Sequence, residues 1–479
     1  MKILKPISNW LLKNKLQHHI FSKGNIKSDL QAGFIVALVL IPQCLAYAQL
    51  AGLPPVYGLY AAIIPCILGV LFGSSNYLST GPVAVLSILT ATTITPLASP
   101  GTPSYVTYVV VLALISGVLQ IILGALKAGW LVNFLSHPVV FGFANAAGIV
   151  IASTQLATFF GVQVPSTHSY LLTLWHTLQA IVSRGDALTA FVGFASLFIY
   201  IVLRHINPRI PGVLIILVLG IFSCWFWDLN IKTISHISNP IPTLAIPQFN
   251  FSYLSNLLGG AAIIALIGFT ETIAIAQSVA AKANQRIDTD RELIGQGIAN
   301  IASAFSGGYP VAGSFSRTAI NYANGAKTWM SAVFCSLIVL LVTVFFFPVL
   351  RFTPNVVLGV IIIVGIAGII NLSKFANMFK VSKPDGIAAL ITFVGTLLFA
   401  PDMEKGILFG LIFSMGYFIY RNTHPNIVFL SRHQDGFLRD RLVYNLKQCK
   451  NIAVIRLDAP LFFGNALFFE NKIISFLSE

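Results

Sequence analysis

The sequence predicts an all-α membrane protein with about fourteen transmembrane segments, arranged as two inverted repeats of seven. Composition is the first reason, since 56% of the 479 residues are hydrophobic and 9% are charged, whereas soluble domains usually carry about 25% charged residues. The second is that apolar stretches of about 17–25 residues, long enough to cross a bilayer, recur along most of the chain. The third is the distribution of basic residues, which follows the positive-inside rule.

The expected segments run in order from residue 31 to residue 421. Residues 1–30 are expected to form a cytoplasmic N-terminal segment, because they are polar and basic and lack the apolar core of a signal peptide. Residues 31–430 are expected to form the transmembrane domain. Its predicted segments are 31–50, 57–73, 81–97, 104–126, 130–159, 187–204, 210–227, 254–281, 289–306, 315–323, 328–349, 355–371, 383–400 and 403–421.

The loop charges fix the predicted orientation. With the N-terminus in the cytoplasm, the outside loops hold only Arg184, Lys232, Arg351 and Lys405, and the other basic loop residues lie inside. An even number of spans then places both termini in the cytoplasm and the protein in the cell membrane. The net charge of +14 does not indicate a nucleic-acid partner, because the basic residues are spread through loops rather than gathered in a patch.

The chain divides into two halves, 31–228 and 251–421, of seven predicted segments each. An odd number per half inserts the second half upside down, and sites in such transporters lie at the repeat interface near the midplane. The third segments, LSTGPVAVLS (78–87) and VAGSFSRTAI (311–320), are short and rich in small polar residues. We interpret them as strands leading into half-helices whose positive N-termini face one cavity. Close helix packing through small residues is the alternative.

Glu271 and Arg317 stand almost alone as charges in apolar segments. Charges at membrane depth are costly, so they usually mark a transport pathway or a proton relay. Opposite signs on two segments favour one shared site for moving an anion, although an ion pair that pins two helices is the structural alternative.

Three runs resemble the SulP family of anion transporters, the sulfate permeases: IPQCLAYAQLAGLPPVYGLYAAIIP (41–65), STGPVAV (79–85) and PVAGSFSRTAINYANGAKT (310–328). The resemblance implies a core domain of the first four and the eighth to eleventh segments, and a gate domain of the rest. It also implies a homodimer and an elevator-like movement of the core against the gate.

The tail, residues 431–479, is similar to the start of the STAS domain that ends most members of that family. NIAVIRLDAP alternates apolar and polar residues as a strand does. NALFFENKIISFL has the pattern of an amphipathic helix that Asn465 could cap. The tail is shorter than the family's domain, so we expect a partial α/β unit.

Candidate anion ligands follow from residue chemistry and from the family pattern. Arg317 offers a fixed charge and up to five N–H donors suited to an oxyanion. The resemblance assigns the adjacent Ser316, and Gln43 of the first segment, to the site. The remaining candidates are hydroxyl donors, an aromatic one turn beyond Gln43, and a ring that could close the pocket: Ser79, Thr80, Ser314, Tyr47 and Phe315.

Glu271 is the predicted coupling residue. Burial favours the protonated carboxyl group, whereas a nearby arginine favours the ionised form, so the group can exchange its proton near physiological pH. The ionised form would compete with the substrate for Arg317, and the protonated form would release Arg317, so proton and anion bind together. A sodium site built from Glu271 with Thr270 or Thr272 is the competing interpretation.

The expected function is proton-coupled symport of an inorganic anion, with sulfate first on family grounds. Moving one charge against 100 mV costs about 2.3 kcal/mol, so a monoanion carried with one proton crosses without that cost and sulfate does not. Bicarbonate or a dicarboxylate, with sodium or protons, therefore stays an alternative, as does a passive anion channel. A membrane enzyme is disfavoured, because the nine histidines lie mostly in loops and termini. No cofactor or metal is expected, since the five cysteines lack disulfide or zinc spacing.

Overall fold

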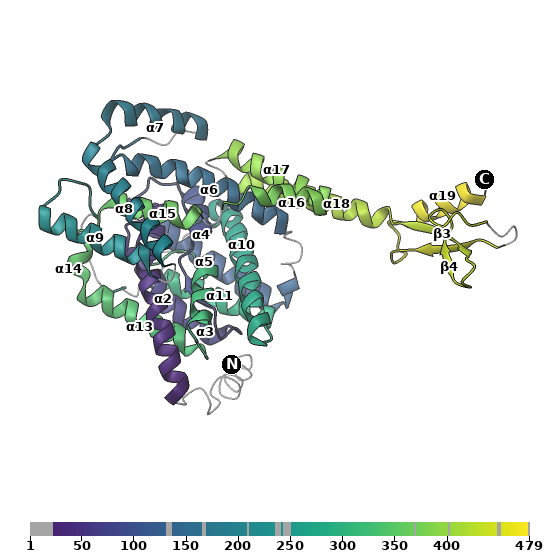
Figure 1. The fold of residues 1–479 in the computed structure, drawn as a ribbon, viewed down its shortest axis with the longest axis horizontal. Coiled ribbons are helices and arrows are strands. Elements are labelled where there is room, and N and C mark those ends of the chain that lie inside the picture. The colour runs from purple at the N-terminus through teal and green to yellow at the C-terminus, as the bar shows by residue number, and fades with distance from the viewer. Residues whose placement is uncertain are drawn as a thin grey trace.

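The computed structural model describes residues 23–130, 137–164, 169–207, 210–234, 241–242, 251–367, 370–400, 403–447 and 452–477. It is mostly helical, and a small sheet with one helix lies beyond the end of the helical body (Figure 1). Most of the expected cytoplasmic N-terminal segment, up to residue 22, lies outside the described residues. So does most of the connection between the two halves.

The helices follow the predicted order. The first half contains α2 (Lys23–Leu50), α3 (Val56–Phe72), strand β1 (Thr80–Gly81), α4 (Ala84–Ile94), α5 (Pro103–Ala125), α6 (His137–Phe159), α7 (Tyr170–Arg184), α8 (Ala187–Ile206) and α9 (Gly212–Trp227). The second half contains α10 (Phe251–Ala283), α11 (Thr289–Phe305), strand β2 (Ala312–Gly313), α12 (Phe315–Ala323), α13 (Met330–Phe345), α14 (Phe347–Leu350), α15 (Asn355–Ala367), α16 (Ser373–Val381), α17 (Lys383–Phe399) and α18 (Glu404–Thr423).

Each predicted segment has a counterpart in the structure, so the predicted helical membrane fold is confirmed. Within the described residues, α2, α5, α6, α8 and α10 are long and apolar enough to cross a membrane, and shorter apolar helices accompany them. Two amphipathic helices, α7 and α16, were not predicted.

Helices from the two halves pack together through small residues. The pair α5 and α11 is the clearest case: a Cβ on Gly117 would lie 2.7 Å from the carbonyl oxygen of Gly297, and a Cβ on Gly297 would lie 2.7 Å from that of Gly117. Any larger side chain would push the backbones apart, which is how glycine permits close approach of helices in membranes. In the same way α2 packs on α13, and α3 on both α11 and α13.

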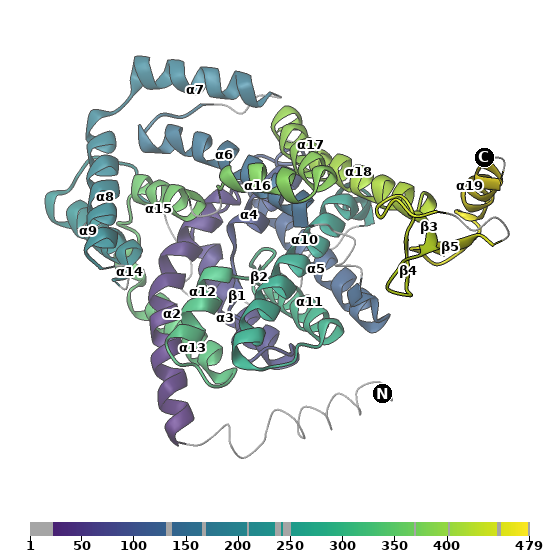
Figure 2. The ribbon, with the colours of Figure 1, turned by 45° about the vertical axis from the view of Figure 1, so that its right-hand side comes forward.

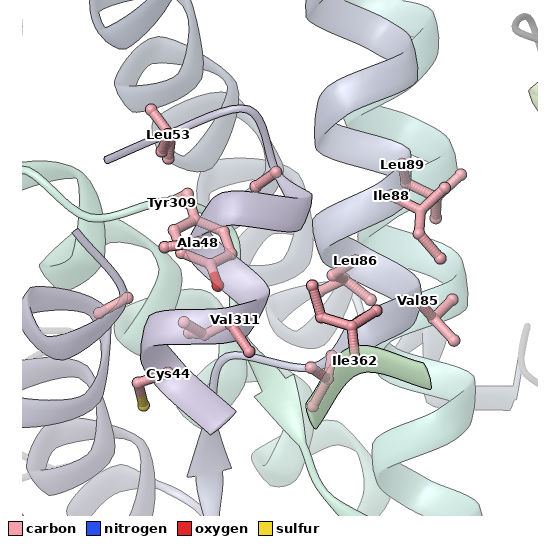
Figure 3. Packing of buried hydrophobic residues seen from close by; sticks show 14 of the residues in the cluster. Cys44, Ala48, Leu53, Val85, Leu86, Ile88, Leu89, Tyr309, Val311 and Ile362 are labelled. Carbon is pink, nitrogen blue, oxygen red and sulfur yellow. The ribbon is translucent and has the colours of Figure 1, made fainter. Parts of the chain in front are cut away.

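The main apolar core surrounds the two short strands. Figure 3 shows Cys44 and Ala48 of α2 next to Tyr309 and Val311, which precede β2, with Leu86 of α4 alongside. These side chains come from both halves of the chain, so the core depends on the two halves being assembled together.

Two further carboxylates are buried near the ends of helices, and the sequence analysis missed them. Asp29 of α2 accepts hydrogen bonds from the backbone N–H groups of Lys327 and Thr328 and from the Thr328 hydroxyl. Glu292 of α11 accepts from the N–H groups of Ser74 and Ser75. Both side chains therefore hold loops between helices in place. Glu271 is thus one of several carboxylates buried in the helical body.

The tail forms a three-stranded antiparallel sheet in the order β4-β3-β5, with strands β3 (Ile427–Arg432), β4 (Leu438–Asp440) and β5 (Val454–Leu457). The predicted strand and helix are both present, as β5 and α19 (Ala466–Leu477). Phe476 of α19 stacks on Phe429 of β3. The expected cap differs, because the side-chain oxygen of Asn465 accepts from the N–H of Phe462, which precedes the helix.

A buried polar cluster holds β2 against α11. The Asn300 amide oxygen accepts from the N–H of Val311 at 2.7 Å, and its NH2 group donates to Gln120 Oε1 at 2.9 Å and to the Val311 carbonyl at 3.1 Å. Removing one partner of a buried hydrogen bond leaves the other unsatisfied.

We expect Asn300→Leu to lower the free energy of unfolding by about 1–3 kcal/mol for each buried polar group that it leaves without a hydrogen-bond partner. Thermal unfolding of the detergent-purified variant would measure this as a lowered Tm. Asn324→Ala is the matched control, because among the described residues the Asn324 side chain bonds only to the carbonyl of Ile320, within its own helical turn. Equal Tm values for Asn300→Leu and the wild type would contradict the prediction.

Candidate functional site

The candidate site is built on the antiparallel ribbon of β1 and β2, in which Thr80 pairs with Gly313 and Gly81 with Ala312. Each strand leads almost directly into a short helix, β1 into α4 and β2 into α12. Because the strands run in opposite directions, the two helices leave the ribbon in opposite directions and their N-termini both point back toward it. The predicted pair of strands and half-helices is thus present, near the middle of the helical body (Figure 2).

Hydrogen bonds from neighbouring helices fix this ribbon. The Ser79 N–H donates to the Thr318 hydroxyl at 3.1 Å, and the Gly313 N–H donates to the Thr272 hydroxyl at 2.9 Å. The Ser314 N–H donates to the Ser79 carbonyl at 3.0 Å. Thr272 and Thr318 therefore position the site, and sequence reasoning assigned neither of them this role.

The first turns of α4 and α12 carry no side-chain cap, since neither the Val83 side chain nor the Ser314 side chain accepts a hydrogen bond from a backbone N–H of its helix. The first N–H groups of a helix have no partner inside the helix, and the helix dipole adds positive potential there. Two uncapped N-termini at one ribbon therefore form a region suited to an anion.

Arg317 adds a full positive charge to this region. It lies in the first turn of α12 with its side chain fully buried. Nη1 donates to Oε1 of Gln43 at 3.2 Å and to the carbonyl of Pro82 at 2.9 Å, and Nε donates to Oγ of Ser79 at 3.4 Å. Nη2 has no hydrogen-bond partner among the described residues. It faces Gly81, where a Cβ would lie 3.4 Å away.

The helix α2 also contributes side chains to the site. Pro42 lies inside this helix and removes one backbone N–H just before Gln43. Gln43 orients Arg317 through its amide oxygen, which leaves the Gln43 NH2 group as a donor. Tyr47, one turn further along, is buried, and its hydroxyl approaches Gly365 of α15.

Glu271 of α10 reaches the same region. Its Oε2 atom is buried and has no hydrogen-bond partner in the part of the chain that the structure describes. The carboxylate and the Tyr47 hydroxyl both lie within electrostatic range of the Arg317 guanidinium. The two isolated charges singled out in the sequence thus come together, without forming a direct ion pair among the described contacts.

The other predicted ligands do not all lie beside Arg317. Ser79 lies beside Arg317, whereas the Thr80 hydroxyl points to the opposite side of β1 and accepts from Gln296 Nε2 at 3.0 Å. Ser314 and Ser316 lie at the start of α12 with their hydroxyl oxygens 3.4 Å apart. Phe315 is 62% exposed, so its ring does not pack in the interior. The Pro82 carbonyl was missed, because backbone acceptors leave no signal in a sequence.

The arrangement can bind and release an anion. It offers a buried guanidinium, two helix N-termini, hydroxyl and amide donors, and one carboxyl group that can carry a proton. Among the described residues, no group of three or more His, Cys, Asp or Glu side chains could hold a metal ion.

Comparisons with known proteins show what the chain is similar to. The sequence model described as the sulfate permease family matches residues 26–392. Among curated proteins, "Probable sulfate transporter 4.2" of Arabidopsis thaliana is 33% identical over 463 residues, which cover 93% of this chain and 67% of that protein. "Probable sulfate transporter MT1781" of Mycobacterium tuberculosis is 29% identical and matches 97% of this chain and 83% of that protein. The chain spans about two thirds of the length of the first Arabidopsis relatives.

Two solved structures are similar to the fold. The murine anion transporter Slc26a9 in its inward-facing state aligns with a TM-score of 0.88 at 22% identity, covering 98% of this chain and 80% of that one. The transmembrane domain of the cyanobacterial bicarbonate transporter BicA aligns with a TM-score of 0.69 at 25% identity, covering 83% of this chain and 99% of that one.

Proposed function

This chain belongs to the sulfate permease family, and we propose that it is a secondary transporter that carries sulfate or a similar small inorganic anion across the cell membrane. The observation that carries the proposal is Arg317, a fully buried guanidinium with Nη2 unpartnered among the described residues, at two uncapped helix N-termini. A buried charge is costly unless it is paired. An oxyanion bound there would compensate the arginine and the two dipoles together.

Sulfate is the first candidate substrate. Nη2 of Arg317 has two free N–H groups that can donate to oxygens of an oxyanion, while Gln43, Pro82 and Ser79 hold Nη1 and Nε in place. Relatives of this chain are named as sulfate transporters. Bicarbonate or a dicarboxylate is the second candidate, supported by the similarity to a bicarbonate transporter.

Proton coupling through Glu271 is part of the proposal. Its carboxylate is near Arg317 without a hydrogen bond to it, so protonation changes the field at the anion site directly. The sodium alternative needs threonine oxygens beside Glu271. The Thr270 hydroxyl donates to the carbonyl of Leu266 at 2.7 Å, and the Thr272 hydroxyl accepts from Gly313. Both hydrogen bonds leave each threonine oxygen a lone pair, so a sodium site beside Glu271 is the second candidate for coupling.

We further propose that the core moves against the gate as an elevator. The proposed core comprises α2–α5 and α10–α13, and its helices pair across the two halves; the proposed gate helices α6, α8, α9, α15, α17 and α18 pack mainly on one another. Homodimer formation, cytoplasmic termini and a partial STAS domain from residue 431 complete the proposal. The positive-inside pattern supports the cytoplasmic termini. The sheet of the tail supports the STAS-like unit, although its strand β3 begins at Ile427, before the expected boundary. The homodimer rests on the family resemblance alone.

Counterflow in proteoliposomes tests the function. Vesicles preloaded with unlabelled sulfate should transiently accumulate labelled sulfate, and the same assay with bicarbonate or fumarate ranks the substrates. A transporter shows this exchange because its site alternates between the two sides. Flux that follows only the electrical and concentration gradients, without accumulation, would indicate an anion channel and contradict the proposal.

A further inference from the structure

An apolar groove lies on the side of α2 that faces away from the anion site. Its volume is about 500 Å³. Its lining comes from α2, α9, α13 and α14, together with Phe346, which precedes α14, and Phe352, which lies two residues after it. All of the lining residues are hydrophobic: Leu38, Ile41, Leu214, Leu217, Val218, Ile221, Phe222, Trp225, Val342, Phe346, Val349, Leu350 and Phe352. We call this the α2–α9 groove.

The α2–α9 groove is continuous with the surface that faces the lipid. Val218, Phe222 and Trp225 of α9 line it and are also exposed, as is Phe346 after α13. Exposed apolar side chains of this size on membrane-spanning helices face lipid tails rather than water. The aromatic cluster at the end of α9, where Phe222 stacks on Phe226 and Trp227 packs on both, has the composition of a membrane-interface belt.

The length of the groove matches one leaflet. Its wall on α9 runs from Leu214 to Trp225, and the eleven steps between these residues, at about 1.5 Å each, give a height of about 16.5 Å. The hydrocarbon core of a bilayer is about 30 Å thick, so each leaflet contributes about half of that. An acyl chain that enters beside the aromatic cluster would therefore fill the groove along its height.

From these observations we infer that the α2–α9 groove binds an acyl chain of a membrane lipid. We also infer that this acyl chain packs on the side of α2 opposite the anion site and stabilises α2 there. The second part rests on the proposed function. Ile41 lines the groove and Gln43 contacts Arg317. Two helical positions correspond to about 200° of rotation, so the two side chains lie on opposite sides of α2.

Helix α2 lacks one backbone hydrogen bond beside the groove, so packing by an acyl chain would stabilise the helix there. Pro42 has no N–H to donate to the carbonyl of Leu38, and Leu38 itself lines the groove. With the groove filled, Ile41 and Leu38 are packed from behind and Gln43 is held against Arg317. With the groove empty, the same turn loses that packing and Gln43 is held less firmly.

Labelling with a phospholipid that carries a photoreactive diazirine on its acyl chain tests the site itself. In proteoliposomes of the wild-type chain, we expect cross-links concentrated on the peptides that contain 214–225 and 342–352. Val218→Trp places a large ring in the groove, so labelling of these peptides should fall to background. Leu219→Trp is the matched control, since Leu219 is also exposed on the same helix but does not line the groove.

Labelling that is unchanged in Val218→Trp, or that is spread evenly over lipid-facing helices, would overturn the site. Wild-type peptides 214–225 and 342–352 that stay unlabelled would indicate that protein, such as a second copy of the chain, covers the groove, and would overturn it as well. Should Val218→Trp fail to fold by its thermal stability, the smaller Val218→Phe substitution serves in the same comparison.

Sulfate affinity tests the stabilisation of α2. Stripping lipid from the purified wild type should weaken sulfate binding, and a single-chain lysophospholipid should restore it. Val218→Trp should bind sulfate with the same affinity in both conditions, because its own ring fills the groove. Wild-type affinity that is indifferent to lipid removal would overturn the stabilisation. Absence of any sulfate binding by the lipid-replete wild type would instead contradict the proposed function, and the labelling result would still stand.

Discussion

Replacing Arg317 with alanine is expected to abolish binding of sulfate while the protein stays folded and inserted. The substitution removes the only full positive charge described at the ribbon, and two helix dipoles alone leave a divalent anion under-compensated. It also removes donors to Gln43, Pro82 and Ser79. Loss of the costly buried charge offsets part of the resulting destabilisation, so a folded variant is expected.

Binding to the purified variants, measured by calorimetry in detergent, checks this expectation. Arg317→Lys should retain partial affinity, because it keeps the charge but loses the planar guanidinium fork that Gln43, Pro82 and Ser79 hold in place. Arg351→Ala is the control, since Arg351 is exposed after α14 and lies over the ring of Phe352. Wild-type affinity in Arg317→Ala would remove Arg317 from the anion site.

The residues of the candidate site could be singled out because the most unusual of them are unusual in the sequence itself. A lone arginine and a lone glutamate in apolar segments are visible without any structure, and so are two Gly- and Ser-rich segments at matching positions in the two halves. Membrane burial makes such residues costly. The structure brings Gln43, Ser79, Glu271 and Arg317 into one region, as expected.

The residues that hold the site together were not predictable in the same way. Asn300, Thr272 and Thr318 act through contacts between segments far apart in the sequence, and each residue taken alone looks like an ordinary polar side chain. One signal was available and was not used. Adjacent residues of a strand face opposite sides, so Ser79 and Thr80 could not both face Arg317.

The helices α7 and α16 were missed for a different reason. The predicted segments were found as long apolar runs, whereas these helices are amphipathic. In α7, Leu171, Trp175, Leu178 and Val182 are exposed and recur at helical spacing, with polar residues between them. Such a pattern is typical of a helix that lies in the membrane interface and does not span it.

The coupling role of Glu271 makes the second large prediction. Glu271→Gln mimics the protonated acid permanently, so Arg317 stays available and sulfate binding should persist. Acceleration of uptake by an inward proton gradient should disappear, leaving exchange or pH-independent movement. Glu271→Ala should behave similarly but be less stable, because it also leaves a void beside the buried Arg317.

The measurement is sulfate uptake into proteoliposomes with and without an imposed pH step, for the wild type and for Glu271→Gln. Glu292→Gln is the matched control: Glu292 is also a buried carboxylate, but it fastens the loop at Ser74 and Ser75. That variant should be less stable yet still respond to the pH step. If Glu271→Gln still concentrates sulfate in response to the step, Glu271 is not the proton carrier. A sodium requirement in the wild type would instead place the cation beside Glu271, because the same carboxylate would then bind sodium where we propose that it binds a proton.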